Sequence, residues 1–183
     1  MSSGKPKGRR AIEAIEAMLT GGHPNSLGRT DEVSAMVLKR PSRLEELYGC
    51  YESADEVVRL RTSSALKRVC QANPALLEPY IGRLLTEIAG LDQASAQWTL
   101  AILFDLLKER MSGAQRADAA AVMKRNLSEN DDWIVLNTTM QVLSDWSADD
   151  PALARWLEPR LHVLSRNDRG SVARRAAKLL AAT

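Results

Sequence analysis

A helical pattern recurs along most of this chain, at intervals that suit a stack of similar helix pairs. Asp55, Asp92 and Asp132 each precede a segment with helical hydrophobic period, at spacings of 37 and 40 residues. Each is followed after seven residues by a threonine and after eleven by a leucine, namely Thr62, Thr99 and Thr139, and Leu66, Leu103 and Leu143. A further copy begins near Asp168. Repeats of this length predict helix pairs that bury a shared core only by stacking.

The segments that would pair with these helices also repeat. NPALLEPYIGRLL starts at Asn73, and DPALARWLEPRLHVL starts at Asp150, 77 residues later. In each, the first residue suits a helix N-cap, and the proline suits the first helical position, where no amide donor is needed. We therefore predict helix pairs in residues 41–71, 74–110, 113–147 and 150–182, with a degenerate unit in residues 9–40 as a further candidate.

The rest of the pattern favours an all-α chain. No segment alternates apolar and polar residues as a half-buried strand does, and Ala, Leu, Arg, Glu and Lys dominate. The content of 45% hydrophobic and 26% charged residues is typical of a folded chain, and 183 residues have room for one domain. We predict a flexible basic tail over residues 1–10 and a single repeat domain over residues 11–183.

Two stretches resemble a known repeat family. DEVVRLRTSSAL, residues 55–66, resembles the opening of the second helix of a HEAT repeat, and PALLEP, residues 74–79, resembles the first helix of the next repeat. The resemblance covers residues 41–182. It implies a right-handed α-α superhelix, a HEAT-like solenoid of about four helix pairs plus one or two N-terminal helices. It also implies that the second helix of each pair lines a concave face, where such proteins bind partners.

Side chains on that implied concave face are the candidate partner-binding residues. Aligning the copies places Arg61, Trp98 and Thr138 in one row, and Arg68, Asp105 and Asp145 in another. Trp98 and Asp105 are seven residues apart and therefore share a face of their helix. An aromatic ring beside a carboxylate could clamp a peptide or a base. The alternative is structural, with Trp98 covering the core and Asp105 pairing with Arg68 or Lys108.

Other conspicuous residues have a structural interpretation. Trp133, Trp146 and Trp156 have apolar neighbours at helical spacing and are predicted to pack in the fold, and the threonine row is predicted to face the core. Cys50 and Cys70 should lie on neighbouring antiparallel helices, separated by roughly 20 Å at 1.5 Å per residue. That distance is beyond the reach of a disulfide, so both are predicted to be free buried thiols.

Basic residues gather towards the end of the chain. The formal net charge is only +2, but residues 150–183 hold seven Lys and Arg against three Asp and Glu. The basic patch comprises Arg166, Arg169, Arg174, Arg175 and Lys178. It has two interpretations: a solvated end cap that keeps a solenoid soluble, or a surface that contacts phosphate.

Recognised catalytic and metal-binding motifs are absent. The sequence has no GxxxxGK[ST] loop, GxGxxG, GxSxG or CxxC motif. Its two histidines, His23 and His162, lack the HExxH spacing of a zinc site. We therefore predict no catalytic residues, no metal and no cofactor. No apolar run approaches the roughly 20 residues that cross a bilayer, so we predict no membrane contact and a cytoplasmic location.

Repeats without a catalytic constellation favour a non-enzymatic scaffold or adaptor that binds a protein or peptide partner along the concave face. The alternative is a nucleic-acid partner, in a DNA-binding or DNA-repair protein resembling the HEAT-like alkylpurine DNA glycosylases. In that case Trp98, Asp105 and nearby arginines would face the DNA.

Overall fold

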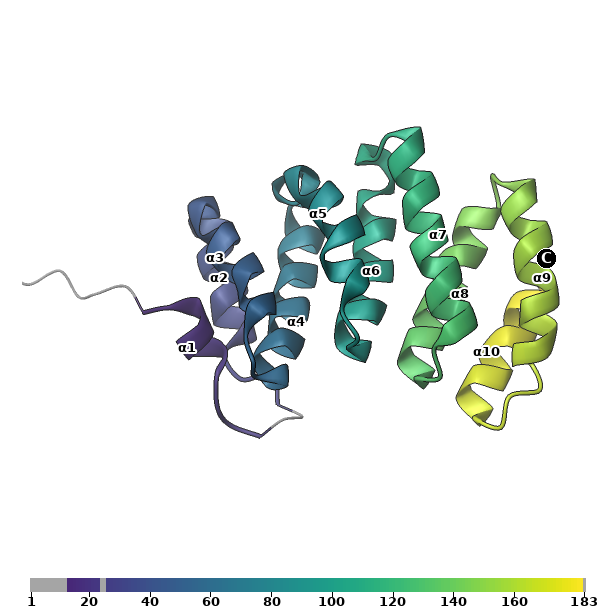
Figure 1. The fold of residues 1–183 in the computed structure, drawn as a ribbon, viewed down its shortest axis with the longest axis horizontal. Helices are drawn as coiled ribbons and strands as arrows, with labels where there is room; N and C mark the ends of the chain where they lie inside the picture. Colours follow the sequence, from purple (N-terminus) through teal and green to yellow (C-terminus); the bar gives the residue numbers. More distant parts are fainter. Residues whose placement is uncertain (1–12, 24–25, 183) are drawn as a thin grey trace, which may run out of the picture.

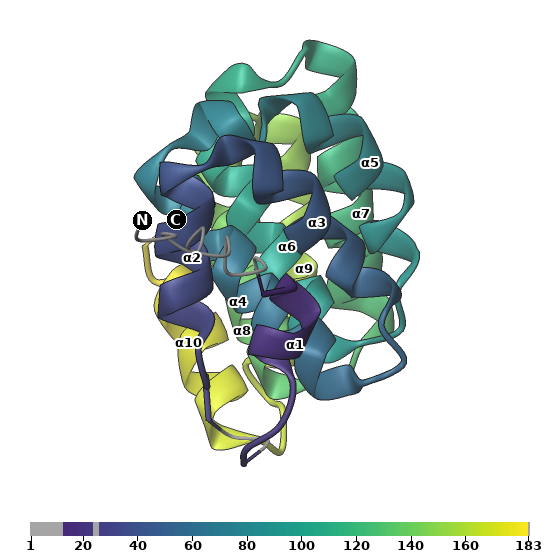
Figure 2. The ribbon, with the colours of Figure 1, turned by 90° about the vertical axis from the view of Figure 1, so that its left-hand side faces the viewer.

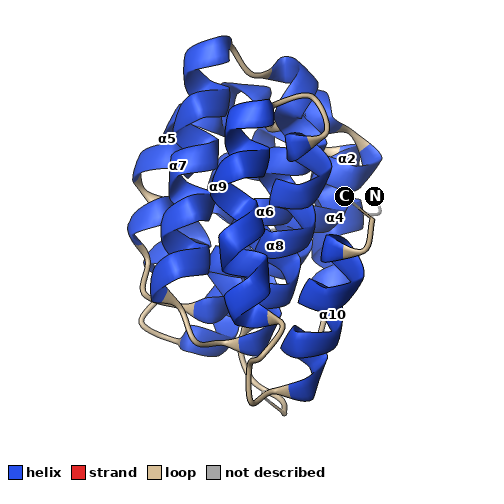
Figure 3. Ribbon diagram, turned by 90° about the vertical axis from the view of Figure 1, so that its right-hand side faces the viewer, coloured by secondary structure: helices blue, strands red, loops and turns tan. Residues whose placement is uncertain are grey.

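The computed structural model describes residues 13–23 and 26–182, and these residues form helices and turns with no strand (Figure 3). The all-α prediction is confirmed. The predicted tail, residues 1–10, lies outside the described residues. The α-helices are α1 (Ile15–Leu19), α2 (Thr30–Lys39), α3 (Leu44–Gly49), α4 (Glu56–Ala72), α5 (Ile81–Thr86), α6 (Ala94–Leu107), α7 (Gly113–Glu129), α8 (Trp133–Ser147), α9 (Pro151–Leu164) and α10 (Gly170–Leu180).

The helices are arranged as a stack of two layers. The helix pairs follow one another in chain order along the longest axis (Figure 1). The views from the two ends place α3, α5, α7 and α9 on one side and α2, α4, α6, α8 and α10 on the other (Figures 2 and 3). Within the second layer each helix packs against the next, from α2 to α10. One cluster of buried apolar side chains runs through the stack from Ile15 to Leu179.

Aspartate caps start three of the longer helices. Asp55 accepts a hydrogen bond from Val57 N at 2.8 Å, and Asp132 and Asp150 each accept two from the first turns of α8 and α9. Pro151 occupies the first position of α9, as predicted. A cap satisfies amides that have no partner within the helix, so it fixes where the helix begins.

The segment after Asn73 departs from the predicted helix. Asn73 makes no side-chain cap, and the chain forms two short 3₁₀ helices, Pro74–Leu76 and Glu78–Tyr80, before α5 begins at Ile81. Pro79 favours the interruption, because proline has no amide to donate and its ring clashes with the preceding turn of an α-helix, although α9 continues through Pro159. The other 3₁₀ helices are Pro41–Arg43, Cys50–Glu52, Ile88–Gly90 and Lys108–Arg110.

The threonine row faces the core, as predicted. Thr62, Thr99 and Thr139 have no exposed surface. The Thr62 hydroxyl donates to Val58 O at 2.8 Å. The hydroxyls of Thr99 and Thr139 are buried and find no hydrogen-bond partner among the described residues. The three positions are therefore equivalent in burial but differ in how their polar atom is satisfied.

This difference predicts opposite effects of one substitution. Thr99→Val and Thr139→Val will each raise the free energy of unfolding by about 1 kcal/mol, because valine removes a buried hydroxyl that lacks a partner. Thr62→Val will lower it by about 1 kcal/mol, since there a hydrogen bond is lost. Urea unfolding of the three variants tests this. Equal destabilisation by all three would show that Thr99 and Thr139 are hydrogen-bonded in solution.

The cysteines are two free buried thiols, as predicted. Cys50 is 5% exposed and Cys70 is fully buried, and neither forms a disulfide. Burial raises the pKa of each thiol to about 11. Both thiols therefore remain protonated near neutral pH. Because the thiolate is the reactive form of cysteine, neither side chain is activated for reaction.

Candidate functional site

The predicted partner-binding residues belong to the layer of α2, α4, α6, α8 and α10. We call the outward surface of that layer the even-helix face. Its exposed and partly exposed side chains on α4 to α10 are Lys67, Arg68, Trp98, Ile102, Asp105, Thr138, Gln141, Asp145, Arg174 and Arg175. On α6 and α8 these positions recur every three or four residues, which places them on one side of the helix.

Arg61, the first member of the predicted row, is not on this surface. Its side chain is 1% exposed, although its position corresponds to that of Trp98 one unit later. The guanidinium donates, over 2.5 to 3.2 Å, to the carbonyl oxygens of Leu19, Gly21, His23 and Ser26. Arg61 therefore anchors the connection between α1 and α2, and that connection covers the place where a partner would have to reach it.

Neighbouring helices are joined across the even-helix face by side-chain contacts. Arg68 forms an ion pair with Asp31 of α2, with 2.6 Å between Nε and Oδ1. Lys67 Nζ lies 4.9 Å from the centre of the Trp98 ring, which joins α4 to α6. Arg175 of α10 donates to Gln141 of α8 at 2.7 Å. These bridges restrain the side chains, so the face would lose little conformational freedom on binding.

Trp98 and Asp105 are both on the even-helix face, but each already has a partner. Trp98 is partly buried beneath Lys67, whose pKa is lowered by burial and then by the charge of Arg68. Asp105 is exposed and accepts a hydrogen bond from Trp146 Nε1 at 3.0 Å. The predicted alternative that Asp105 pairs with Arg68 or Lys108 is wrong: Arg68 pairs with Asp31, and Lys108 Nζ lies 5.5 Å from the Trp146 ring.

Thr138 and Asp145 complete the predicted set on α8. Thr138 is partly exposed one turn before Gln141, and Asp145 is exposed one turn after it. Gln141 Nε2 donates to Asp145 Oδ1 at 2.9 Å, while its oxygen accepts from Arg175. The Gln141 side chain thus links the Asp145 carboxylate to the Arg175 guanidinium.

The other tryptophans divide into two groups. Trp146 is 5% exposed, and Trp156 packs partly buried between Arg160, 3.8 Å from its ring centre, and Lys124, 5.2 Å from it. Trp133 contradicts the packing prediction, because half of its side chain is exposed. The reason is its position as the first residue of α8, before the helix reaches the core.

The predicted basic patch lies on the last helix pair and the turn within it. Arg166, Arg169, Arg174 and Lys178 are exposed, and none has an ion-pair partner among the described residues. The seven ion pairs of the described chain all involve residues 13–110. The basic charge after residue 150 is therefore not neutralised by direct contact with carboxylates.

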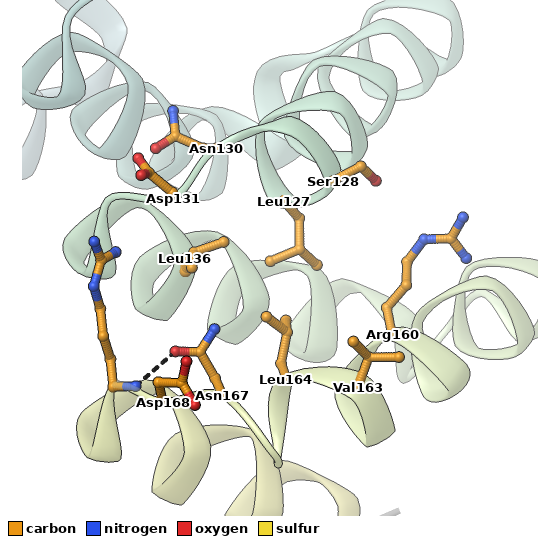
Figure 4. Close-up of a pocket in the computed structure, with 11 residues that line it drawn as sticks. Leu127, Ser128, Asn130, Asp131, Leu136, Arg160, Val163, Leu164, Asn167 and Asp168 are labelled. Carbon is orange, nitrogen blue, oxygen red and sulfur yellow. Dashed lines mark hydrogen bonds between the residues drawn. The ribbon is translucent and has the colours of Figure 1, made fainter.

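A cleft of about 620 Å³ opens beside the basic patch, between the ends of α7 and α9 and the turns that follow them (Figure 4). Leu127, Leu136 and Leu164 contribute its apolar floor. Val163, also on the wall, is 72% exposed. The polar lining residues are Ser128, Asn130, Asp131, Arg160, Asn167, Asp168 and Arg169. We call this the carboxyl-terminal cleft.

Sequence reasoning identified the even-helix face and the basic patch but not this cleft. The sequence feature that could have indicated the cleft is the spacing of Trp156, Arg160 and Val163 on α9. Spacings of four and three place these residues on one side of the helix, where Val163 is exposed and Arg160 is partly buried. The sequence alone did not show that α7 leaves that side open.

Within the described residues no three His, Cys, Asp or Glu side chains are grouped as metal ligands would be. The helices in this part of the chain include none long and apolar enough to cross a membrane.

A scan against protein-family models finds no match, and a search among curated proteins finds no similar sequence.

Proposed function

We propose that this chain is a non-enzymatic scaffold or adaptor that binds a segment of a partner protein across the even-helix face. In this proposal the pairs stack as a right-handed, HEAT-like superhelix whose concave side is that face. The repeats and the lack of catalytic motifs in the sequence favour a binding role.

The observation that carries the proposal is the apolar centre of the face. Trp98 and Ile102 lie one turn apart on α6, are partly exposed, and stand outside the cluster of buried core residues. Polar bridges flank them, through Lys67 on one side and through Asp105 and Trp146 on the other. A held tryptophan inside a polar surround resembles the arrangement of interface hot spots, where a few aromatic anchors supply most of the binding energy.

The nucleic-acid alternative receives less support from this face. Asp105 on α6 and Asp145 on α8 are exposed carboxylates on the even-helix face. They would repel a phosphate backbone that crossed this face. The one ring at the centre, Trp98, is partly covered by Lys67. A base would have to displace that contact before stacking.

Comparing two tryptophan variants tests the proposal. Tagged wild-type protein, Trp98→Ala and Trp133→Ala are used to capture partners from the native source, and Trp133 serves as the control because it is more exposed but lies at the start of α8. A stoichiometric partner should be retained by the wild type and Trp133→Ala, and reduced about tenfold or more by Trp98→Ala, as expected for a hot spot. Equal retention by Trp98→Ala would contradict the proposal.

A further inference from the structure

We propose that the carboxyl-terminal cleft and the arginines beside it form a second docking site, which binds an acidic protein segment carrying a bulky aliphatic side chain. This site is separate from the even-helix face. It does not depend on the function proposed there.

The aliphatic part of the proposal comes from the floor of the cleft. Leu127 and Leu136 are 5% and 3% exposed, and together with the partly buried Leu164 they form an apolar base beside Val163. Val163 is the most exposed of the large hydrophobic residues in the described chain. The cleft, at about 620 Å³, is within the range of about 300–1,000 Å³ that is typical of ligand sites.

The cleft lies between two neighbouring units of the stack. At the corresponding places in earlier units, side-chain hydrogen bonds join one unit to the next. Arg59 donates to Gln93 at 2.6 Å, which ties the start of α4 to the turn before α6. Asn130 donates to Gln97 at 2.5 Å and ties the next turn to α6. Among the described residues no side-chain hydrogen bond joins the α7–α8 turn to the α9–α10 turn, and the cleft lies between them (Figure 4). This step of the stack is therefore open to an external segment.

Two arginines, Arg160 and Arg169, line this opening, and Arg166 lies on the turn that follows α9. The Arg166 amide donates to Val163 O at 3.1 Å, so this arginine belongs to the turn that starts three residues before it, at the exposed valine. None of the guanidiniums of Arg160, Arg166 and Arg169 has a carboxylate partner among the described residues, so charge complementarity favours an acidic segment.

The same lining favours protein over nucleic acid. The residues of the cleft include no aromatic side chain on which a base could stack. Asp131 and Asp168 stand on the rim, where they would repel a continuous phosphate backbone. A protein segment can place its own carboxylates at the arginines and direct an amide or hydroxyl towards the aspartates.

Unbiased peptide selection tests the proposal. A library of random twelve-residue peptides is selected on the full chain. Recovered peptides are then measured by fluorescence anisotropy against Val163→Ser and the double variant Arg166→Glu/Arg169→Glu. Arg116→Glu/Arg155→Glu is the matched control: it changes the net charge equally, and both residues are exposed and away from the cleft lining. Circular dichroism confirms that each variant is folded.

The expected peptides combine several Asp or Glu with Leu, Ile, Val or Met. Val163→Ser and Arg166→Glu/Arg169→Glu should each weaken their binding about tenfold or more, while the matched control and Trp98→Ala change it less than about twofold. The proposal is overturned if the recovered peptides are not acidic, or if the matched control weakens them as much as the cleft variants. It is also overturned if a single-stranded oligonucleotide competes for the cleft more tightly than the peptides, or if a second copy of this chain occupies it in solution.

Discussion

Replacing Arg61 with alanine will lower the free energy of unfolding by about 3 kcal/mol, which for a chain of this size corresponds to a fall in Tm of roughly 6–12 °C. The residue is 1% exposed, and no carboxylate among the described residues is paired with it. Its charge is instead stabilised by hydrogen bonds to backbone carbonyl oxygens, which lose their donors when the side chain is removed.

The size of the effect comes from the number of backbone groups that depend on one side chain. The guanidinium satisfies four carbonyl oxygens in the connection between α1 and α2. Gly28 lies against it: this glycine has a φ of 52°, and a Cβ there would be 3.0 Å from Arg61 Cζ. Lysine cannot reproduce the planar fork of donors, so Arg61→Lys should recover less than half of the loss.

Hydrogen exchange distinguishes this role from a general loss of stability. In Arg61→Ala, the backbone amides of residues 15–23 and 26–30 should exchange much faster, while those of α6 and α8 change only as far as global stability falls. Arg68→Ala is the control, because its ion-pair partner Asp31 is largely exposed and the pair contributes about 1 kcal/mol at most. If Arg61→Ala were as stable as Arg68→Ala, water must replace the guanidinium at these carbonyls.

The burial of Arg61 shows why the sequence predicted the helices better than it predicted which side chains are exposed. Helical periodicity and the spacing of Asp55, Thr62 and Leu66 depend on contacts within one unit, and these determined the all-α class and the buried threonines correctly. Arg61 and Trp98 were aligned as equivalent positions, but Arg61 is buried and Trp98 is partly exposed. Whether Arg61 faces solvent depended on a connection more than thirty residues away, which periodicity does not describe.

Contacts between units also explain why the sequence did not predict the exposure of Trp133 or the carboxyl-terminal cleft. Trp133 has apolar neighbours, but its exposure depends on where α8 begins, which Asp132 fixes by capping the helix one residue earlier. The cleft depends on the spacing between α7 and α9, two helices separated by a third in the chain. Packing between units decides both features, and no short stretch of sequence contains that information.

Tryptophan substitutions separate the residues that maintain the fold from those available for binding. Trp146→Ala will lower the free energy of unfolding by about 3–5 kcal/mol, the usual cost of removing a buried aromatic side chain. Trp146 is 5% exposed and joins α8 to α6 through Asp105. Trp98→Ala, by contrast, should cost about 1 kcal/mol, because Trp98 lies outside the buried core and chiefly loses its contact with Lys67.

The hydrogen bond between Trp146 and Asp105 can be measured separately. Trp146→Phe keeps most of the ring and should cost about 1 kcal/mol, and Asp105→Ala should cost a similar amount. Because both substitutions remove the same bond, the double variant should be less destabilised than the sum of the two, by about 1 kcal/mol in urea unfolding. Strict additivity would show that the indole and the carboxylate are not bonded in solution. Asp105 would then be free to contact a partner beside Trp98, as the spacing of these two residues on α6 first indicated.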